Sequence, residues 1–191
     1  MIKEYKMASG TKEIIINAAF KIIDEEGFWN VSFERICDKY KLEPKSIEKY
    51  FSDKNEIIYH VSKLELGRIM SSLETKEGEA SFQDLVSTMN SFINWGRNFP
   101  NRFGMIFRPY VEWSDEYLEY SVNMRKEFIA KACEYIKRPV KGLKPEIIAY
   151  MLWSLCTGAI LLEIMAHFQE DGKNITTTEE LIFAQISLLY N

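Results

Sequence analysis

The sequence predicts an all-α protein in two parts, a small helix-turn-helix domain at the N-terminus and a longer helical bundle behind it. Apolar residues recur at helical spacing through most of the 191 residues, and single glycine and proline residues separate these stretches. In addition, 47% of the residues are apolar, which is enough for a packed core. We expect about nine helices, with residues 1–53 forming the first domain and residues 54–191 the second.

The first predicted helix, Thr11–Glu26, carries apolar residues at positions i, i+3, i+4 and i+7 counted from Ile15. It is expected to end at Gly27, because glycine readily takes the left-handed conformation after a helix. Phe28 would then fold back on Ile23, as in a Schellman motif.

Two short helices follow and have the layout of a helix-turn-helix between about Ser32 and Phe51. Ser32 is a suitable N-cap for the first of them, and Pro44 suits the first position of the second. The connection, Tyr40–Glu43, is brief, and lysines lie on the outer face of the second helix. Such a helix can enter the major groove of DNA, which is about 12 Å wide.

The remaining helices are expected to be longer. A fourth should run over residues 54–74 and be followed by a polar break. The pair Thr177 and Glu180 forms a capping box for the last helix. Including that helix, we expect further helices over residues 81–99, 101–112, 114–137, 145–170 and 177–190.

The charge balance does not by itself indicate a nucleic-acid partner. The net charge is −4, and residues 1–54 hold ten basic and ten acidic residues, so the negative excess lies in residues 55–191. Between Lys39 and Lys54 there are five lysines and three carboxylates. This weak basic patch could also be an ordinary solvated helix face.

The cysteines and histidines favour neither an enzyme nor a metal site. Cys37, Cys133 and Cys156 are widely spaced in apolar surroundings, which favours reduced core thiols in a cytoplasmic protein. The chain has two histidines, no glycine-rich phosphate loop and no nucleophile motif. Glu163 and His167 could face one ligand on a helix, but two groups fall short of a metal site. We therefore expect no catalysis and no cofactor.

One uncharged run, residues 147–162, requires a test for a membrane span. A span needs about 20 predominantly apolar residues. This run is shorter and contains Ser154 and Thr157, so a buried helix and no membrane partner are expected.

Four segments between residues 15 and 57 occur in an order and spacing that resemble the TetR (tetracycline repressor) family: Ile15–Ala19, Gly27-Phe28, Ser32-Phe33-x-x-Ile36 and Tyr50–Ile57. The nine-helix layout is also that of the family. The resemblance implies a transcriptional regulator, a ligand-responsive repressor that binds double-stranded DNA as a homodimer.

The resemblance also implies roles for residues of the motif. Lys54 matches a family lysine that contacts backbone phosphate, at a helix N-terminus whose amides also favour anions. Ser32 and Tyr50 would donate their hydroxyls to phosphate, although they could also only cap and pack. Lys45, Ser46 and Lys49 would lie in the groove, along with Glu48.

Two positions depart from the family where DNA would be read. Tyr40-Lys41 replaces Ala-Gly in the turn, and Glu48 replaces a tyrosine. A carboxylate beside phosphates is repelled unless it accepts a hydrogen bond from a cytosine N4 amine. Either the operator is unusual or DNA binding is weak. The alternative is a protein of the same fold with a degenerate helix-turn-helix, serving as an antirepressor or as a small-molecule or protein-binding module.

An aromatic-rich stretch in the second domain could line a cavity for a small hydrophobic effector, with Arg108 and Glu112 as polar groups nearby. Plain core packing is the alternative for each residue. The predicted lining residues are Trp95, Phe103, Phe107, Tyr110, Trp113, Tyr117, Met124 and Met151.

The segment over residues 145–170 is apolar nearly all round, so it must be buried on more faces than one bundle of this size can cover. With the last helix it predicts a symmetric four-helix dimer interface, and a two-fold dimer predicts a pseudo-palindromic operator. The predicted interface residues are Leu155, Ala159, Leu162, Phe183 and Ile186.

Overall fold

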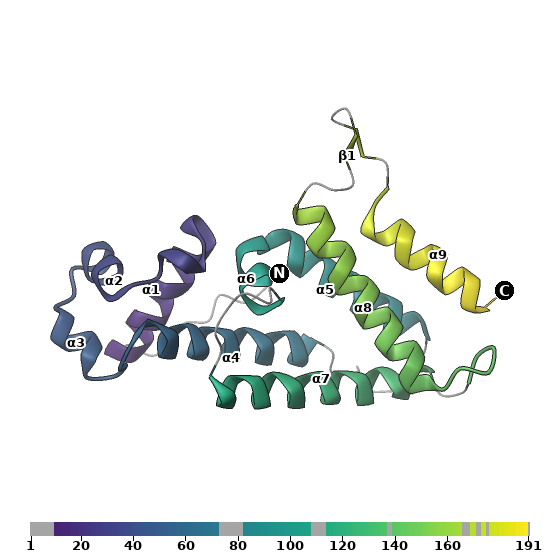
Figure 1. Ribbon diagram of the computed structural model, residues 1–191, viewed down its shortest axis with the longest axis horizontal. Helices are drawn as coiled ribbons and strands as arrows, with labels where there is room; N and C mark the ends of the chain where they lie inside the picture. The colour runs from purple at the N-terminus through teal and green to yellow at the C-terminus, as the bar shows by residue number, and fades with distance from the viewer. Residues whose placement is uncertain are drawn as a thin grey trace. The chain divides into compact units, whose positions relative to one another are not determined.

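The structure is a computed structural model that describes residues 10–72, 82–107, 114–136, 139–165, 169–170, 173–174 and 176–190. The all-α prediction is confirmed, with nine α-helices in these residues, one short 3-10 helix and two strands of two residues each (Figure 1). The elements are α1 Thr11–Glu26, η1 Phe28–Asn30, α2 Phe33–Tyr40, α3 Pro44–Glu48, α4 Lys54–Ser72, α5 Phe82–Asn98, α6 Pro100–Phe107, α7 Asp115–Ile136, α8 Pro145–Ile164, β1 Gln169–Glu170, β2 Lys173–Asn174 and α9 Thr178–Tyr190.

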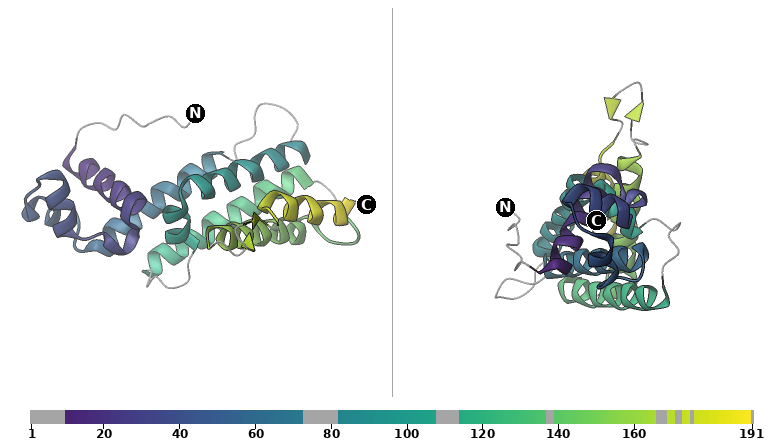
Figure 2. Two further views of the ribbon diagram at one scale, coloured as in Figure 1. Left: turned by 90° about the horizontal axis from the view of Figure 1, so that it is seen from above. Right: turned by 90° about the vertical axis from the view of Figure 1, so that its left-hand side faces the viewer.

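The chain divides into two compact units. The first consists of Met1–Glu65 with Asn101–Tyr117, and the second of Leu66–Pro100 with Leu118–Asn191. The helix-turn-helix therefore lies in the first unit, and α5, α8 and α9 lie in the second, where α8 and α9 pack side by side (Figure 2). The predicted boundary after residue 53 separates a DNA-binding part from an effector-binding part, whereas the two units are defined by their internal contacts. The predicted boundary therefore stays a prediction.

The core of the first unit holds the three N-terminal helices together. α1 buries the apolar face that its spacing predicts, and Ile15 and Ile22 are fully buried. α2, α3 and α4 each add a fully buried isoleucine to the same core, namely Ile36, Ile47 and Ile57. The inner faces of the helices are thus occupied, and polar residues remain on their outer sides.

Gly27 ends α1 as predicted, but in a different conformation. Its φ of +87° is one that glycine adopts readily, because it has no Cβ. Its ψ of 155° lies outside the left-handed helical region, so the predicted Schellman ending is wrong. The chain turns directly into η1 instead, which still buries Phe28.

The helix predicted over residues 145–170 is too long. α8 ends at Ile164, and Gln169–Glu170 pairs antiparallel with Lys173–Asn174. The pairing of these two short strands takes the place of the last part of the predicted helix. By length and composition alone, α8 is the one helix of the described residues that could cross a membrane, a test that core helices of soluble proteins also pass.

Candidate functional site

The turn of the helix-turn-helix forms without a glycine. Lys41 ends α2 in the left-handed conformation, with φ 52° and ψ 42°. The N–H groups of Lys41 and Leu42 both donate to the carbonyl of Cys37. A left-handed residue with a Cβ costs roughly 1–2 kcal/mol. The missing glycine therefore strains the turn but does not open it.

α3 presents lysines on the side opposite the core. Pro44 occupies its first turn, and Ile47 is fully buried. At roughly 100° per residue, Lys45 and Lys49 each lie about 160° around the helix from Ile47. Both are exposed, as is Glu48, whereas Ser46 is half-buried. Lys45 and Lys49 are thus the residues that α3 directs outward.

The cations of this region fall into two groups. On α2, Arg35 pairs with Glu26 at 2.7 Å and Lys39 pairs with Glu25. The hydrogen bond from Arg35 lowers the pKa of the Glu26 carboxyl. Both acids belong to α1, so these pairs tie α2 to α1.

By contrast, the lysines that follow α2 form no ion pair within the described residues. These are Lys41, Lys45, Lys49 and Lys54. The nearest aromatic contact places the Lys49 ammonium 5.8 Å from the centre of the Tyr50 ring. Four cations therefore remain available to an anionic partner.

The start of α4 is capped by side chains that the sequence analysis missed. The Glu56 N–H donates to Asp53 Oδ1 at 2.9 Å, and Glu56 Oε2 accepts from the Ser52 N–H at 2.7 Å and the Ser52 hydroxyl at 2.9 Å. These bonds lower the pKa of Glu56. The pattern Ser-Asp-x-x-Glu at residues 52–56 is a capping signal that can be recognised in the sequence. It fixes exposed Lys54 at the first position of α4, where a helix N-terminus also attracts anions.

The other two predicted phosphate donors have structural roles in the structure. Ser32 is the N-cap of α2, and its Oγ accepts from the Arg35 N–H at 3.1 Å. Tyr50 is half-buried and packs against the core. All seven residues predicted to contact DNA lie in the first unit, on or beside α2, α3 and the start of α4 (Figure 1).

Arg102 of α6 forms the most buried charge cluster of the first unit. It donates to both Asp24 oxygens at 2.7 and 2.6 Å and to Glu65 at 3.3 Å, and its guanidinium lies 4.7 Å from the centre of the Phe20 ring. Burial would lower the pKa of Arg102, but the hydrogen bonds and charges of Asp24 and Glu65 raise it. The Glu65 side chain is only 2% exposed. The cluster links α6 to α1 and α4.

The predicted effector-lining residues that the structure describes are distributed over both units. Phe103, Phe107 and Tyr117 belong to the first unit, while Trp95, Met124 and Met151 belong to the second and are half-buried. Two further predicted residues lie outside the described residues: Tyr110 and Trp113.

The second unit instead holds a small apolar cavity of about 10 Å³, lined among others by Phe92, Phe128, Trp153 and Cys156. The Trp153 ring stacks on Phe92 with centres 5.5 Å apart and touches Phe128 at 4.4 Å. These rings fill the space that a ligand would need. Burial raises the pKa of the Cys156 thiol to about 12, as expected for an inert core cysteine.

The first unit has a larger open cleft of about 650 Å³ along the start of α4. Its lining combines apolar surface, such as that of Ile58, with the polar groups of Tyr59, His60, Lys63 and Glu116. The Tyr59 hydroxyl donates to Glu116 at 2.7 Å. This lining does not match the apolar cavity that the sequence predicts.

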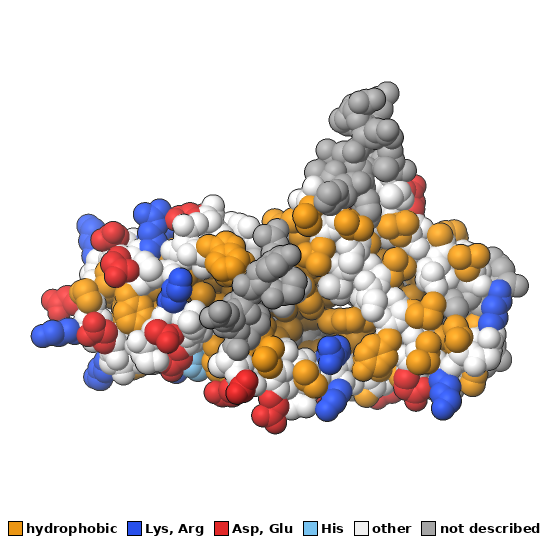
Figure 3. All heavy atoms as spheres, in the orientation of Figure 1, with side chains coloured by type: hydrophobic (Ala, Val, Ile, Leu, Met, Phe, Trp, Pro, Cys, Tyr) orange, Lys and Arg blue, Asp and Glu red, His pale blue; other side chains and the backbone are white. Residues whose placement is uncertain are grey.

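α8 and α9 share an exposed apolar face (Figure 3). Of the residues predicted for the dimer interface, Leu162 and Phe183 belong to it, and Phe183 is 73% exposed. Leu155 and Ile186 are half-buried. Ala159 is 3% exposed in the protomer, and its place in an interface stays a prediction. The other exposed members are Ile147, Tyr150, Met165 and Leu188.

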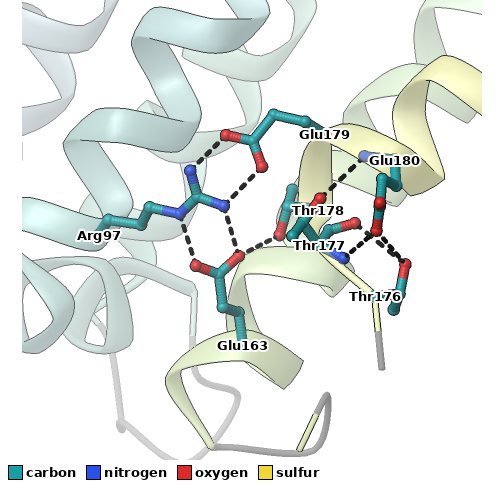
Figure 4. Close-up of polar contacts among 7 residues, drawn as sticks. All are labelled: Arg97, Glu163, Thr176, Thr177, Thr178, Glu179 and Glu180. Atoms are coloured by element: carbon teal, nitrogen blue, oxygen red, sulfur yellow. Dashed lines mark hydrogen bonds and ion pairs between the residues drawn. The ribbon is translucent and has the colours of Figure 1, made fainter. Parts of the chain in front are cut away.

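Arg97 of α5 fixes α8 and α9 to one another (Figure 4). It forms a two-bond pair with Glu163 of α8, at 2.5 and 3.0 Å, and a second two-bond pair with Glu179 of α9. Glu163 also accepts from the Thr178 hydroxyl at 2.5 Å. The hydrogen bonds from Arg97 lower the pKa of both carboxyls.

The capping box predicted for the last helix is confirmed beside this cluster. The Glu180 N–H donates to Thr177 Oγ1 at 3.2 Å, and the Thr177 N–H donates to Glu180 Oε2 at 2.9 Å (Figure 4). Together with Arg97, the box sets where α9 begins.

No protein-family model and no curated protein matches the sequence. Solved structures do match. A TetR transcriptional regulator from Legionella pneumophila has a TM-score of 0.73 at 17% identity, covering 95% of this chain and 98% of that one. FadR from Bacillus subtilis, in complex with stearoyl-CoA, has a TM-score of 0.68 at 16% identity and covers 92% and 97%. NalD of Pseudomonas aeruginosa, the secondary repressor of the MexAB-OprM efflux pump, has a TM-score of 0.67 at 15% identity and covers 95% and 96%. The chain therefore has the fold of TetR-type transcriptional regulators.

Proposed function

We propose that this protein is a cytoplasmic, DNA-binding transcriptional regulator of the TetR family, a ligand-responsive repressor that binds a pseudo-palindromic operator as a homodimer. The observation that carries the proposal is the set of unpaired lysines on the outer side of the helix-turn-helix. These four lysines form no ion pair that would stabilise the free protein. Such a set suits a polyanion.

The geometry of α3 and α4 supports the proposed DNA contact. With Ile47 buried, α3 can enter the major groove with Lys45 and Lys49 foremost. Lys54 would meet backbone phosphate at the N-terminus of α4, where its ammonium and the helix amides act together. Phosphate contacts position the protein, and the side chains of α3 select the bases.

The exposed face of α8 and α9 supports a homodimer. Gly158 lies near the middle of α8, and a Cβ added to it would meet nothing within 4 Å in the protomer. Glycine within a helix costs about 1 kcal/mol relative to alanine. A glycine that its own protomer does not require fits a close approach of α8 to a second copy.

Dimerisation can be tested by sedimentation of the Phe183→Lys variant, which buries a charge in the proposed interface. We expect a folded monomer. Leu118→Lys is the matched control, since Leu118 is a 48% exposed apolar residue of α7 outside that face. The homodimer would be wrong if Phe183→Lys sediments like the wild type.

A hydrophobic effector is proposed for the second unit. FadR, which shares the fold, was solved with stearoyl-CoA. Here the cavity between α5, α7 and α8 is apolar but holds only about 10 Å³, so a ligand must displace the rings of Phe92, Phe128 and Trp153. A ligand that binds better to the conformation with displaced rings would shift the dimer population away from the conformation that binds DNA.

The proposed function is tested by gel shifts with the DNA upstream of the protein's own gene. We expect tighter retention of this DNA than of a scrambled sequence of the same composition, across a range of salt concentrations. Equal retention of the two at every salt concentration would exclude specific binding.

One observation favours the alternative of a degenerate helix-turn-helix. Glu48 is an exposed carboxylate on the helix that would enter DNA, where phosphates repel it. If the wild type binds no specific DNA and Glu48→Tyr restores such binding, the protein is better described as a protein-binding or small-molecule-binding module.

A further inference from the structure

Glu48 has no evident role in the folded protein. It is exposed, it is the last residue of α3, and it makes no hydrogen bond or ion pair within the described residues. Lys45 and Lys49 lie close by in sequence, yet neither pairs with it. The C-terminal end of a helix also disfavours a negative charge. Nothing in the described structure therefore compensates this carboxylate.

Glu48 shares its surroundings with carboxylates of α2. After burial, the pKa of the Cys37 thiol is raised most by Asp38, then by Glu34 and then by Glu48. Three carboxylates, including that of Glu48, therefore act on one buried thiol. An exposed carboxylate without a bond in the described structure can be explained by a partner that it meets in a complex.

The position of Glu48 on α3 limits what that partner group can be. Glu48 lies about 100° around the helix from buried Ile47, at the rim of the outer side from which Lys45 and Lys49 project. A helix inserted with these lysines foremost carries Glu48 into the major groove beside them. The groups within reach there are base edges.

We propose that Glu48 is a specificity-determining residue whose carboxylate accepts a hydrogen bond from the N4 amine of a cytosine in each operator half-site. The assignment rests on the proposed function, since it needs α3 in the major groove. Guanine and the thymine O4 present acceptors there, and these repel a carboxylate. The adenine amine lies between two acceptors, its own N7 and the thymine O4, whereas the cytosine amine has an acceptor, the guanine O6, on one side only.

The lysines beside Glu48 fit the same kind of site. Lys45 and Lys49 can donate to guanine O6 and N7, so the outer side of α3 carries both a donor for guanine and an acceptor for cytosine. Where no cytosine is present, no hydrogen bond offsets the repulsion between the Glu48 carboxylate and the DNA phosphates. Glu48 should therefore weaken binding to non-operator DNA, which a merely structural residue would not do.

The experiment selects DNA sequences with the full-length wild type and with Glu48→Gln and Glu48→Ala. A glutamine amide pairs best with adenine N6 and N7, so Glu48→Gln should change one cytosine per half-site to adenine. Glu48→Ala should lose the preference at that position and bind random DNA more tightly than the wild type does. Asp38→Asn is the control, because it removes a carboxylate near the same thiol without entering the groove.

A second arm probes the amine itself. An operator in which that cytosine is replaced by an analogue lacking the N4 amine should bind the wild type about tenfold more weakly. The same operator should bind Glu48→Ala as the unmodified one does. Circular dichroism confirms that each variant is folded.

The outcomes separate the two proposals. If the wild type selects a sequence, but Glu48→Gln and Glu48→Ala select the same one, the cytosine assignment is wrong and the proposed function stands. If the wild type selects no sequence, both fail.

Discussion

The edge formed by α3 and the start of α4 differs from the cluster that joins α5, α8 and α9 in how its charged side chains are paired. At the edge, Lys45, Lys49 and Lys54 are exposed and form no ion pair within the described residues. In the cluster, Arg97 makes two-bond pairs to both Glu163 and Glu179. The paired charges of the cluster hold three helices together, whereas the lysines of the edge are the ones that we propose to meet DNA. The comparison predicts that stability and DNA affinity depend on separate residues.

The largest effect on stability is expected at the Arg102 cluster, which is paired like that of Arg97 but is more deeply buried. Arg102→Ala removes a cation that pairs with the buried Glu65 carboxylate and with Asp24. Removing one partner of a buried pair costs about 3–5 kcal/mol. Denaturant unfolding measures the loss. Arg35→Ala is the matched control at an exposed pair, and it should cost under about 1 kcal/mol. Equal losses would remove the distinction between buried and exposed pairs.

A smaller loss is expected for Arg97→Ala, because this cluster is partly exposed. Losing hydrogen bonds to charged groups costs about 2 kcal/mol. Since α9 then loses its attachment to α5, the dimer should also weaken, which sedimentation measures. Arg97→Lys should recover part of both, as a lysine keeps the charge but not the two-bond geometry.

The same cluster predicts a pH dependence. Glu163 and Glu179 have a pKa below their ordinary value of 4.5 in the folded state, because Arg97 stabilises their charged forms. Their contribution is therefore complete above about pH 4.5 and is lost as the pH falls through the lowered folded pKa. Arg97→Ala should unfold with a shallower dependence on pH in this window. Equally steep profiles for wild type and variant would contradict the assignment.

Lys41→Gly should stabilise the protein by about 1 kcal/mol, because it removes the strain of a left-handed residue with a Cβ. Lys45→Gly makes the same chemical change within α3 and should destabilise it by a similar amount. Thermal or denaturant unfolding distinguishes the two signs. A loss of stability in Lys41→Gly would mean that the turn is not strained as described.

How far the sequence predicts the structure depends on the distance between the interacting residues. The starts of α2, α3 and α9 follow from Ser32, Pro44 and Thr177, because a cap acts on its own first turn. The end of α8 was missed because the helical pattern continues into residues that pair as a hairpin. The end of a helix is therefore predictable where one local signal sets it, and not where a helical pattern and a strand pairing compete.

The charge clusters and the effector residues could not be predicted in the same way. Arg97 meets Glu163 66 positions away and Glu179 82 positions away, and no pattern in one segment specifies such partners. The aromatic stretch that suggested a single cavity contributes Phe103 to the first unit and Trp95 to the second. The exposed lysines of α3 were predictable because a five-residue helix with one buried residue has only one outer side.

The central claim is that the unpaired lysines contact DNA and contribute nothing to the fold. It is tested most directly by the salt dependence of DNA affinity for the wild type and Lys54→Ala, with Lys126→Ala, an exposed lysine of α7, as the control. Each lost phosphate contact reduces the steepness of log K against log salt by about 0.9. A dimer of Lys54→Ala loses two such contacts, so its slope should be shallower by about 2. Its free energy of unfolding should be unchanged. The account is contradicted if all three proteins show the same slope.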